Sequence, residues 1–121
     1  MEDYNQPLTQ EDLEMAEYIW KILKLQQIKV WSWGVEPNSV HPIKQGTQFH
    51  VQGFLMEGTV KITYDEAMDL FDLELLPDDT AEPRKAFLGL YLDNLVSTID
   101  QNVEYDGKYE ERISEEYASM T

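Results

Sequence analysis

The fold is decided by residues 47–76, which read TQFHVQGFLMEGTVKITYDEAMDLFDLELL. β-branched and aromatic residues alternate with polar ones here, which is typical of strands that bury one face. The alternation predicts strands at residues 47–56, 59–64 and 68–76. Glu57 and Gly58 are expected to form a tight turn that joins the first two strands as a hairpin.

The third of these strands has the clearest pattern. Asp72 and Glu74 are expected to face water, and the alternate positions are expected to face the core: Phe71, Leu73 and Leu75. A short helix that starts at Asp65 is the alternative for the first half of this strand.

Upstream of the strands, residues 10–26 are predicted to form a helix. Thr9 can cap its N-terminus, Asp12 stands three residues later as a variant of the capping box, and Leu8 with Leu13 fits a hydrophobic staple. Acidic residues early in the helix and lysines late in it suit the helix dipole. The buried stripe is expected to contain Leu13, Ala16, Trp20 and Leu23, with Ile19 and Ile22 beside it.

Residues 28–35 are rich in β-branched and aromatic side chains and are predicted to form another strand. Trp31 and Trp33 would then share one face, as part of the core or as an exposed aromatic platform for a partner. If that face lies away from the helices, something must cover it. A homodimer partner is one candidate, and the C-terminal segment with Tyr109, Ile113 and Tyr117 is the other.

After a break at residues 77–80, a second helix is expected to begin near Pro83 and to fade near Asn102. Its apolar face would contain Phe87, Leu90, Tyr91, Leu95 and Ile99. Residues 108–121 have the spacing of a short amphipathic helix, but their glutamates favour fraying. The expected architecture is therefore a single α+β domain over residues 1–107. It has an N-terminal helix, a four-stranded mainly antiparallel sheet and a second helix, with the helices on one face, followed by an acidic helix or tail over 108–121.

Charge is the strongest functional signal. The chain has 121 residues and a formal net charge of −15. The first sixty residues hold eight acids and four bases, whereas the rest hold sixteen acids and five bases. Eight of those acids fall within residues 65–82 without a base among them: Asp65, Glu66, Asp69, Asp72, Glu74, Asp78, Asp79 and Glu82. We expect the acids of residues 65–116 to converge on one anionic surface.

Such a surface would attract a cationic partner and would repel nucleic acid and anionic lipid. Regularly spaced carboxylates could occupy the basic groove of a nucleic-acid-binding protein, because duplex DNA also presents regularly spaced anions. The sequence thus favours a non-enzymatic binding protein. Its narrower form is a nucleic-acid mimic that inhibits a nuclease or DNA-binding protein, of the kind carried by phages and mobile elements. The plain alternative is that the acids only solvate one face.

Enzymatic motifs and cofactor fingerprints are not found in the sequence, so no catalytic residue, metal or cofactor is expected. Residues 102–107 resemble the first half of an EF-hand loop, but Ile113 stands where the bidentate carboxylate is needed. His50 alternates with apolar residues and is expected to face solvent from a strand. The chain has no cysteine and no secretory or membrane-spanning pattern, so a soluble, cytoplasmic protein is expected. The rival function is an accessory subunit that binds a protein partner through the Trp31 and Trp33 strand.

Overall fold

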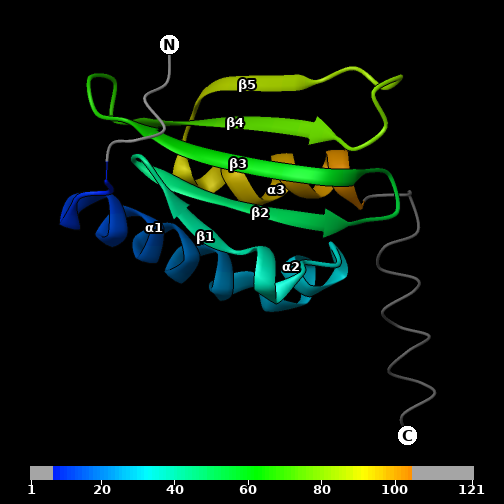
Figure 1. Ribbon diagram of the computed structural model, residues 1–121, viewed down its shortest axis with the longest axis horizontal. Coiled ribbons are helices and arrows are strands. Elements are labelled where there is room, and N and C mark those ends of the chain that lie inside the picture. Colours follow the sequence, from blue (N-terminus) through cyan, green and yellow to red (C-terminus); the bar gives the residue numbers. More distant parts are fainter. Residues whose placement is uncertain (1–6, 105–121) are drawn as a thin grey trace, which may run out of the picture.

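Five antiparallel strands form the centre of the molecule, whose computed structural model describes residues 7–104 (Figure 1). The strands follow one another in space as they do in the sequence, each paired with the next. They are β1 (His41–Ile43), β2 (Gly46–Gln52), β3 (Glu57–Asp65), β4 (Leu70–Pro77) and β5 (Lys85–Leu90). The α+β class is confirmed, but the sheet has five strands and not four.

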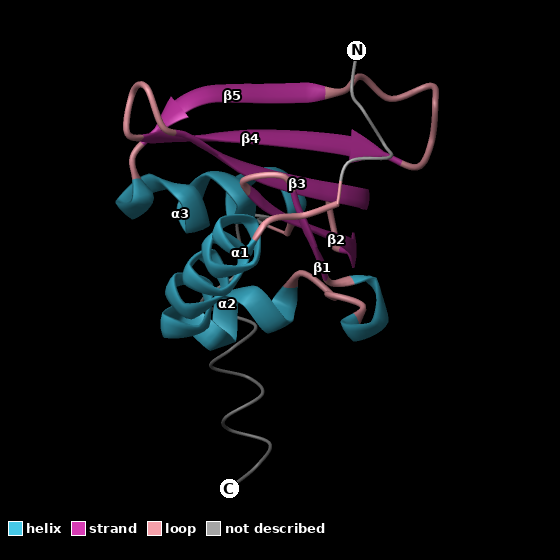
Figure 2. Ribbon diagram, turned by 60° about the vertical axis from the view of Figure 1, so that its left-hand side comes forward, coloured by secondary structure: helices cyan, strands magenta, loops and turns pink. Residues whose placement is uncertain are grey.

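The helices lie on one side of this sheet, as Figures 1 and 2 show. They are α1 (Gln10–Leu23), α2 (Gln27–Ser32) and α3 (Leu92–Val103), and a 3-10 turn (Lys24–Gln26) joins the first two. A second 3-10 turn (Pro37–Ser39) precedes β1. Within residues 7–104, no helix has the length and apolar character needed to cross a membrane.

The predicted capping box at the start of α1 is confirmed. The Thr9 hydroxyl accepts a hydrogen bond from the Asp12 amide at 3.2 Å, and the Asp12 carboxylate accepts one from the Thr9 amide at 2.9 Å. Asp12 also accepts a bond of 2.8 Å from the Gln45 amide, in the turn between β1 and β2. These backbone hydrogen bonds lower the pKa of Asp12 below its ordinary value of 3.8, so the cap also ties the helix to the sheet.

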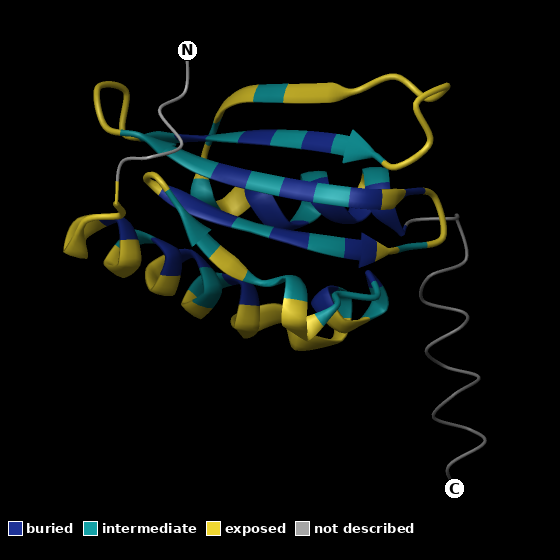
Figure 3. Cartoon of the chain, viewed as in Figure 1, coloured by how far each residue is buried: buried dark blue, intermediate teal, exposed yellow. Residues whose placement is uncertain are grey.

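The core lies between the helices and the inner face of the sheet. Two rows of paired residues cross β2, β3 and β4 on this face: Phe49, Val60 and Leu75, and Thr47, Ile62 and Leu73. Ile19 and Leu23 from α1 and Leu95 and Ile99 from α3 belong to the same buried cluster. Figure 3 shows the alternation of buried and less buried residues along these strands, which confirms the inward side chains predicted for β4.

The predicted strand at residues 28–35 is wrong, because α2 and a turn ending at Gly34 occupy this segment. Val30 and Trp33 are both buried, and a spacing of three puts two side chains on one face of a helix, not of a strand. Packing against the core therefore overrides the β propensity of the segment. Only residues 34–36 run beside β2, where Val35 forms an isolated bridge with Val51.

The hairpin of β2 and β3 is confirmed, but its turn was placed wrongly. The chain turns at residues 53–56, where the Gly53 amide donates to the Met56 carbonyl at 2.9 Å, and Glu57 and Gly58 begin β3. A Cβ on Gly58 would lie 2.3 Å from the Leu76 carbonyl oxygen. This glycine is therefore explained by close strand packing and not by a turn.

The predicted helix from Pro83 is wrong in its first half, where β5 pairs with β4. Gly89 lies within β5 and has a φ of +72°, which the interior of a helix does not allow. The second half is confirmed, because α3 ends at Val103 and buries Leu95 and Ile99.

The structure also tests two smaller expectations. The alternative helix at Asp65 is instead a turn into β4, and the short strand β1 was missed. In α1, Leu13 is exposed, because the buried side of the helix is formed by Asp12, Ala16, Ile19 and Leu23. The proposed domain limit at 107 and the predicted C-terminal helix lie outside the described residues.

Candidate binding surface

The eight acids of residues 65–82 lie along β4 and the two turns that flank it; together they are called the acidic strip. Asp65 ends β3, Glu66 and Asp69 lie in the turn before β4, and Asp72 and Glu74 lie on the outer face of β4. The remaining three, Asp78, Asp79 and Glu82, lie in the loop before β5. At a rise of ~3.3 Å per residue, β4 separates the two turns by roughly 23 Å. The acids thus form a strip with two ends and not one compact cluster.

The turn before β4 is held by its own acids. The Tyr64 hydroxyl donates to the Asp69 carboxylate at 2.6 Å, and the Asp65 carboxylate accepts from the Met68 amide at 3.3 Å. The bond to Asp69 raises the pKa of Tyr64 above its ordinary value of 10.0, and the charges of Glu66 and Asp65 raise it further. The negative charge concentrated at this turn therefore disfavours ionisation of the Tyr64 hydroxyl.

The middle of the acidic strip is partly compensated. Glu74 lies directly across from Lys61 on β3, and its carboxylate is 4.0 Å from the lysine Nζ. Asp72 accepts a hydrogen bond of 3.0 Å from the Gly89 amide of β5. The pairing of β4 with β5 is irregular at this point, between Phe71 and Leu73. Lys61 therefore interrupts the negative potential on the outer face, which the sequence alone did not reveal.

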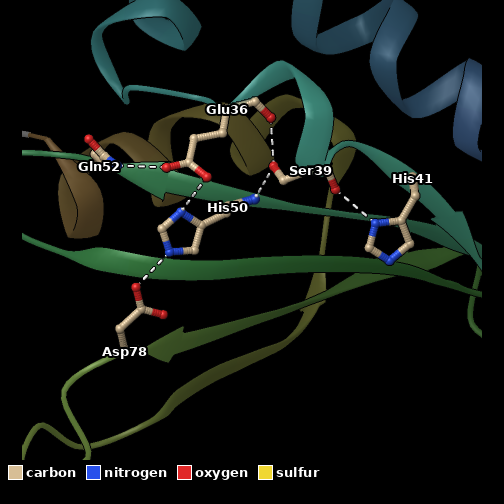
Figure 4. A network of polar contacts seen from close by, with 6 residues as sticks. All are labelled: Glu36, Ser39, His41, His50, Gln52 and Asp78. Atoms are coloured by element: carbon tan, nitrogen blue, oxygen red, sulfur yellow. Dashed lines mark hydrogen bonds and ion pairs between the residues drawn. The ribbon is translucent and has the colours of Figure 1, made fainter.

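A histidine links the far end of the strip to the opposite edge of the sheet (Figure 4). The Nε2 atom of His50 lies 2.6 Å from the Asp78 carboxylate, and its Nδ1 atom lies 3.2 Å from the Glu36 carboxylate. The Nδ1 atom is buried and forms no hydrogen bond. Its contact with Glu36 is therefore an ion pair. The hydrogen bond to Asp78 raises the pKa of His50 above 6.5, partial burial opposes this, and the charges of Asp78 and Glu36 add to it.

Short-range contacts on the edge of β2 hold Glu36 in place. The Gln52 side-chain amide donates to the Glu36 carboxylate at 2.6 Å, and the Ser39 hydroxyl donates to the Glu36 carbonyl at 2.6 Å. The same Ser39 oxygen accepts from the His50 amide at 2.8 Å. His50 does lie on the outer face, as expected. Its two carboxylate partners come from the segment beside β2 and from the loop after β4, and the sequence does not show that these positions meet.

Among residues 83–104, the structure separates the acids from the strip. Asp100 is buried on the helix side of the sheet and accepts a hydrogen bond of 3.0 Å from the Trp33 indole. Glu104 is buried as well and accepts one of 2.7 Å from the Phe54 amide, and Asp93 lies exposed on α3. The expected convergence of all the acids of residues 65–116 is therefore wrong, because two of them satisfy polar groups within the fold.

The two tryptophans predicted to share a face point in different directions. Trp33 is 0% exposed, whereas Trp31 is 73% exposed. The predicted aromatic platform of both side chains is therefore wrong, and Trp31 is the one of the two that is exposed.

Metal-binding geometry is likewise missing from the part of the chain that the structure describes, where no group of three His, Cys, Asp or Glu side chains converges. In the segment that resembles an EF-hand, Asn102 accepts a hydrogen bond of 3.2 Å from Lys85, and Glu104 is occupied as described above. Asp106 and Gly107 lie beyond the described residues.

Comparison with protein-family models, curated proteins and solved structures gives no match to this chain.

Proposed function

We propose that this chain is a non-enzymatic binding protein whose acidic strip binds a basic macromolecular surface. In its narrower form, the protein occupies the DNA groove of a nuclease or another DNA-binding protein and so acts as a nucleic-acid mimic. The observation that carries the proposal is the position of eight carboxylates along β4 and its two flanking turns, with Asp72 and Glu74 on the outer face of the sheet.

Strand geometry supports the mimic form. Asp72 and Glu74 are alternate residues of β4, so they are ~6.8 Å apart on one face. The turn acids add negative charge beyond both ends of the strand. An extended row of anions suits the lysines and arginines that DNA-binding proteins place along the phosphate backbone.

The ion pair of Lys61 with Glu74 in the middle of the strip provides one test of the proposed binding surface. If the strip is the binding surface, Lys61 opposes the partner, and the Lys61→Gln variant should bind a basic partner a few-fold more tightly. An increase in affinity is informative because loss of folding cannot produce it.

The main experiment compares two triple variants with equal net charge. In the strip variant, Asp72→Asn, Glu74→Gln and Asp78→Asn remove three charges from the strip. In the control, Glu11→Gln, Glu14→Gln and Glu17→Gln remove three from α1. Each immobilised protein captures lysate proteins at low and high salt, and an arginine-rich peptide serves as a defined probe.

The strip variant should bind the arginine-rich peptide roughly tenfold more weakly, because each lost charge contact contributes up to about 1 kcal/mol. The α1 variant should bind as the natural chain does. Captured proteins should be basic, elute with salt and be displaced by duplex DNA. Equal losses in both variants would show that only total charge matters, and the strip would then have no special role.

A further inference from the structure

The outside of the first helical segment carries an exposed apolar stripe. Ile28 and Trp31 are 52% and 73% exposed on α2, three residues apart, and Leu25 in the preceding turn is 77% exposed. Residues three apart lie on the same side of a helix. Val30 and Trp33 of the same segment face the core, so the segment is apolar toward solvent as well as toward the sheet. Leu25, Ile28 and Trp31 are called the Trp31 stripe.

Positive charge surrounds this stripe in an otherwise acidic molecule. Residues 18–35 contain no Asp or Glu but three lysines: Lys21, Lys24 and Lys29. Within residues 7–104, these lysines form no ion pair. The stripe and its lysines therefore fit a partner that is both apolar and acidic.

The chain itself contains such a partner. Residues 105–121 read YDGKYEERISEEYASMT, with Tyr109, Ile113 and Tyr117 at intervals of four and five acids between and around them. The described chain also ends next to the segment that carries the stripe, on its core side. Trp33, two residues after Trp31, donates its indole N–H to Asp100 at 3.0 Å, and the Glu104 amide donates to the Asp100 carbonyl.

We propose that residues 105–121 bind across the Trp31 stripe, with their glutamates opposite the three lysines. Seventeen residues can span up to roughly 56 Å, several times the ~10–12 Å diameter of a helix, so they can pass from the core side of α2 to its outer side. A short tether gives an effective concentration in the millimolar range. The segment therefore covers the stripe of its own chain before a second copy can, and the acidic strip across the sheet stays open.

A spin label tests this contact in the full chain. The sequence has no cysteine, so Ser114→Cys provides a single site for a nitroxide. The NMR signals of the Ile28 amide and the Trp31 indole should lose most of their intensity. The amides of Lys61 and Glu74, across the sheet, should keep theirs.

Two further variants separate docking from general attraction. Ile113→Asp in the labelled chain should restore the Ile28 and Trp31 signals, because it places a charge among the apolar positions. Ser119→Asp adds the same charge off that spacing and should leave the signals weak. The Lys61 and Glu74 amides, which lie across the sheet from the stripe, report in every variant that the fold is intact.

Three results would overturn the proposal. One is full intensity at Ile28 and Trp31 in the labelled chain. Another is equal recovery in the Ile113→Asp and Ser119→Asp variants. The third is signal loss in an isotope-labelled natural chain mixed with spin-labelled protein, since that would show a second copy on the stripe.

Discussion

The two faces of the sheet differ in what holds them together. The inner face is a largely apolar layer, in which Leu73 and Ile62 are fully buried in one cluster with residues of α1 and α3. The outer face carries alternate residues of the same strands, and its contacts are ion pairs and hydrogen bonds such as those of His50 and Glu74. Because burial stabilises far more than exposed ion pairs do, the inner face determines stability and the outer face is open to changes in charge.

The largest expected effect on stability comes from removing a buried side chain on the inner face. Leu73→Ala removes a fully buried side chain from the central row of the core and should lower the free energy of unfolding by about 2–5 kcal/mol. Glu74→Gln, the next residue on the opposite face, should change it by less than about 0.5 kcal/mol. Urea denaturation of both variants measures the contrast, and similar losses would mean that the two faces are not distinct.

The buried polar pair on the helix side should rank second. Trp33→Phe leaves the buried Asp100 carboxylate without its indole donor and should cost about 1–3 kcal/mol. Trp31→Phe changes an exposed ring and should cost almost nothing by comparison. Thermal unfolding of the two variants provides the test, and a greater loss for Trp31→Phe would contradict the placement of these side chains.

On the outer face, His50 should make stability depend on pH. Its pKa is higher in the folded protein than the ordinary value of 6.5. Its stabilising effect is therefore complete below about pH 6.5 and is lost as the pH rises through the raised value. The natural chain should lose stability relative to His50→Gln as the pH increases from about 6 to about 9. Parallel pH profiles for the two proteins would show that the ion pairs with Asp78 and Glu36 contribute nothing.

The pair of Lys61 and Glu74 should give the smallest effect. Its atoms are 4.0 Å apart on a partly exposed surface, where such pairs contribute roughly 0–1 kcal/mol. A double-mutant cycle with Lys61→Gln and Glu74→Gln should yield a coupling free energy below about 0.5 kcal/mol. A coupling above 1 kcal/mol would make the outer face a structural element and weaken its assignment as a binding surface.

Elements with local signals could be predicted from the sequence. The capping box of Thr9 and Asp12 and the alternation in β4 involve neighbouring residues, and both are confirmed. Residues 28–35 and 85–90 were misassigned because short apolar runs fit either a helix or a strand. Contacts far along the chain decided them: Trp33 with Asp100 in the first case, and pairing with β4 in the second.

In the candidate surface, too, some features could be predicted from the sequence and others could not. The acids of residues 65–82 are consecutive along one strand and its turns, so their proximity followed from the sequence. The positions of Lys61 beside Glu74 and of Glu36 beside His50 depend on strand pairing, which composition and spacing do not specify. The burial of Asp100 also required the packed helices, since nothing in its local sequence distinguishes it from a surface acid.

The central claim is that recognition belongs to the acidic strip. Its most direct test is to titrate the isotope-labelled chain with an arginine-rich peptide at low salt and to map the amide shifts by NMR. The largest shifts should fall within residues 65–82 and should disappear at high salt. Shifts centred on Glu11, Glu14 and Glu17 of α1, or spread evenly over both faces, would contradict the claim.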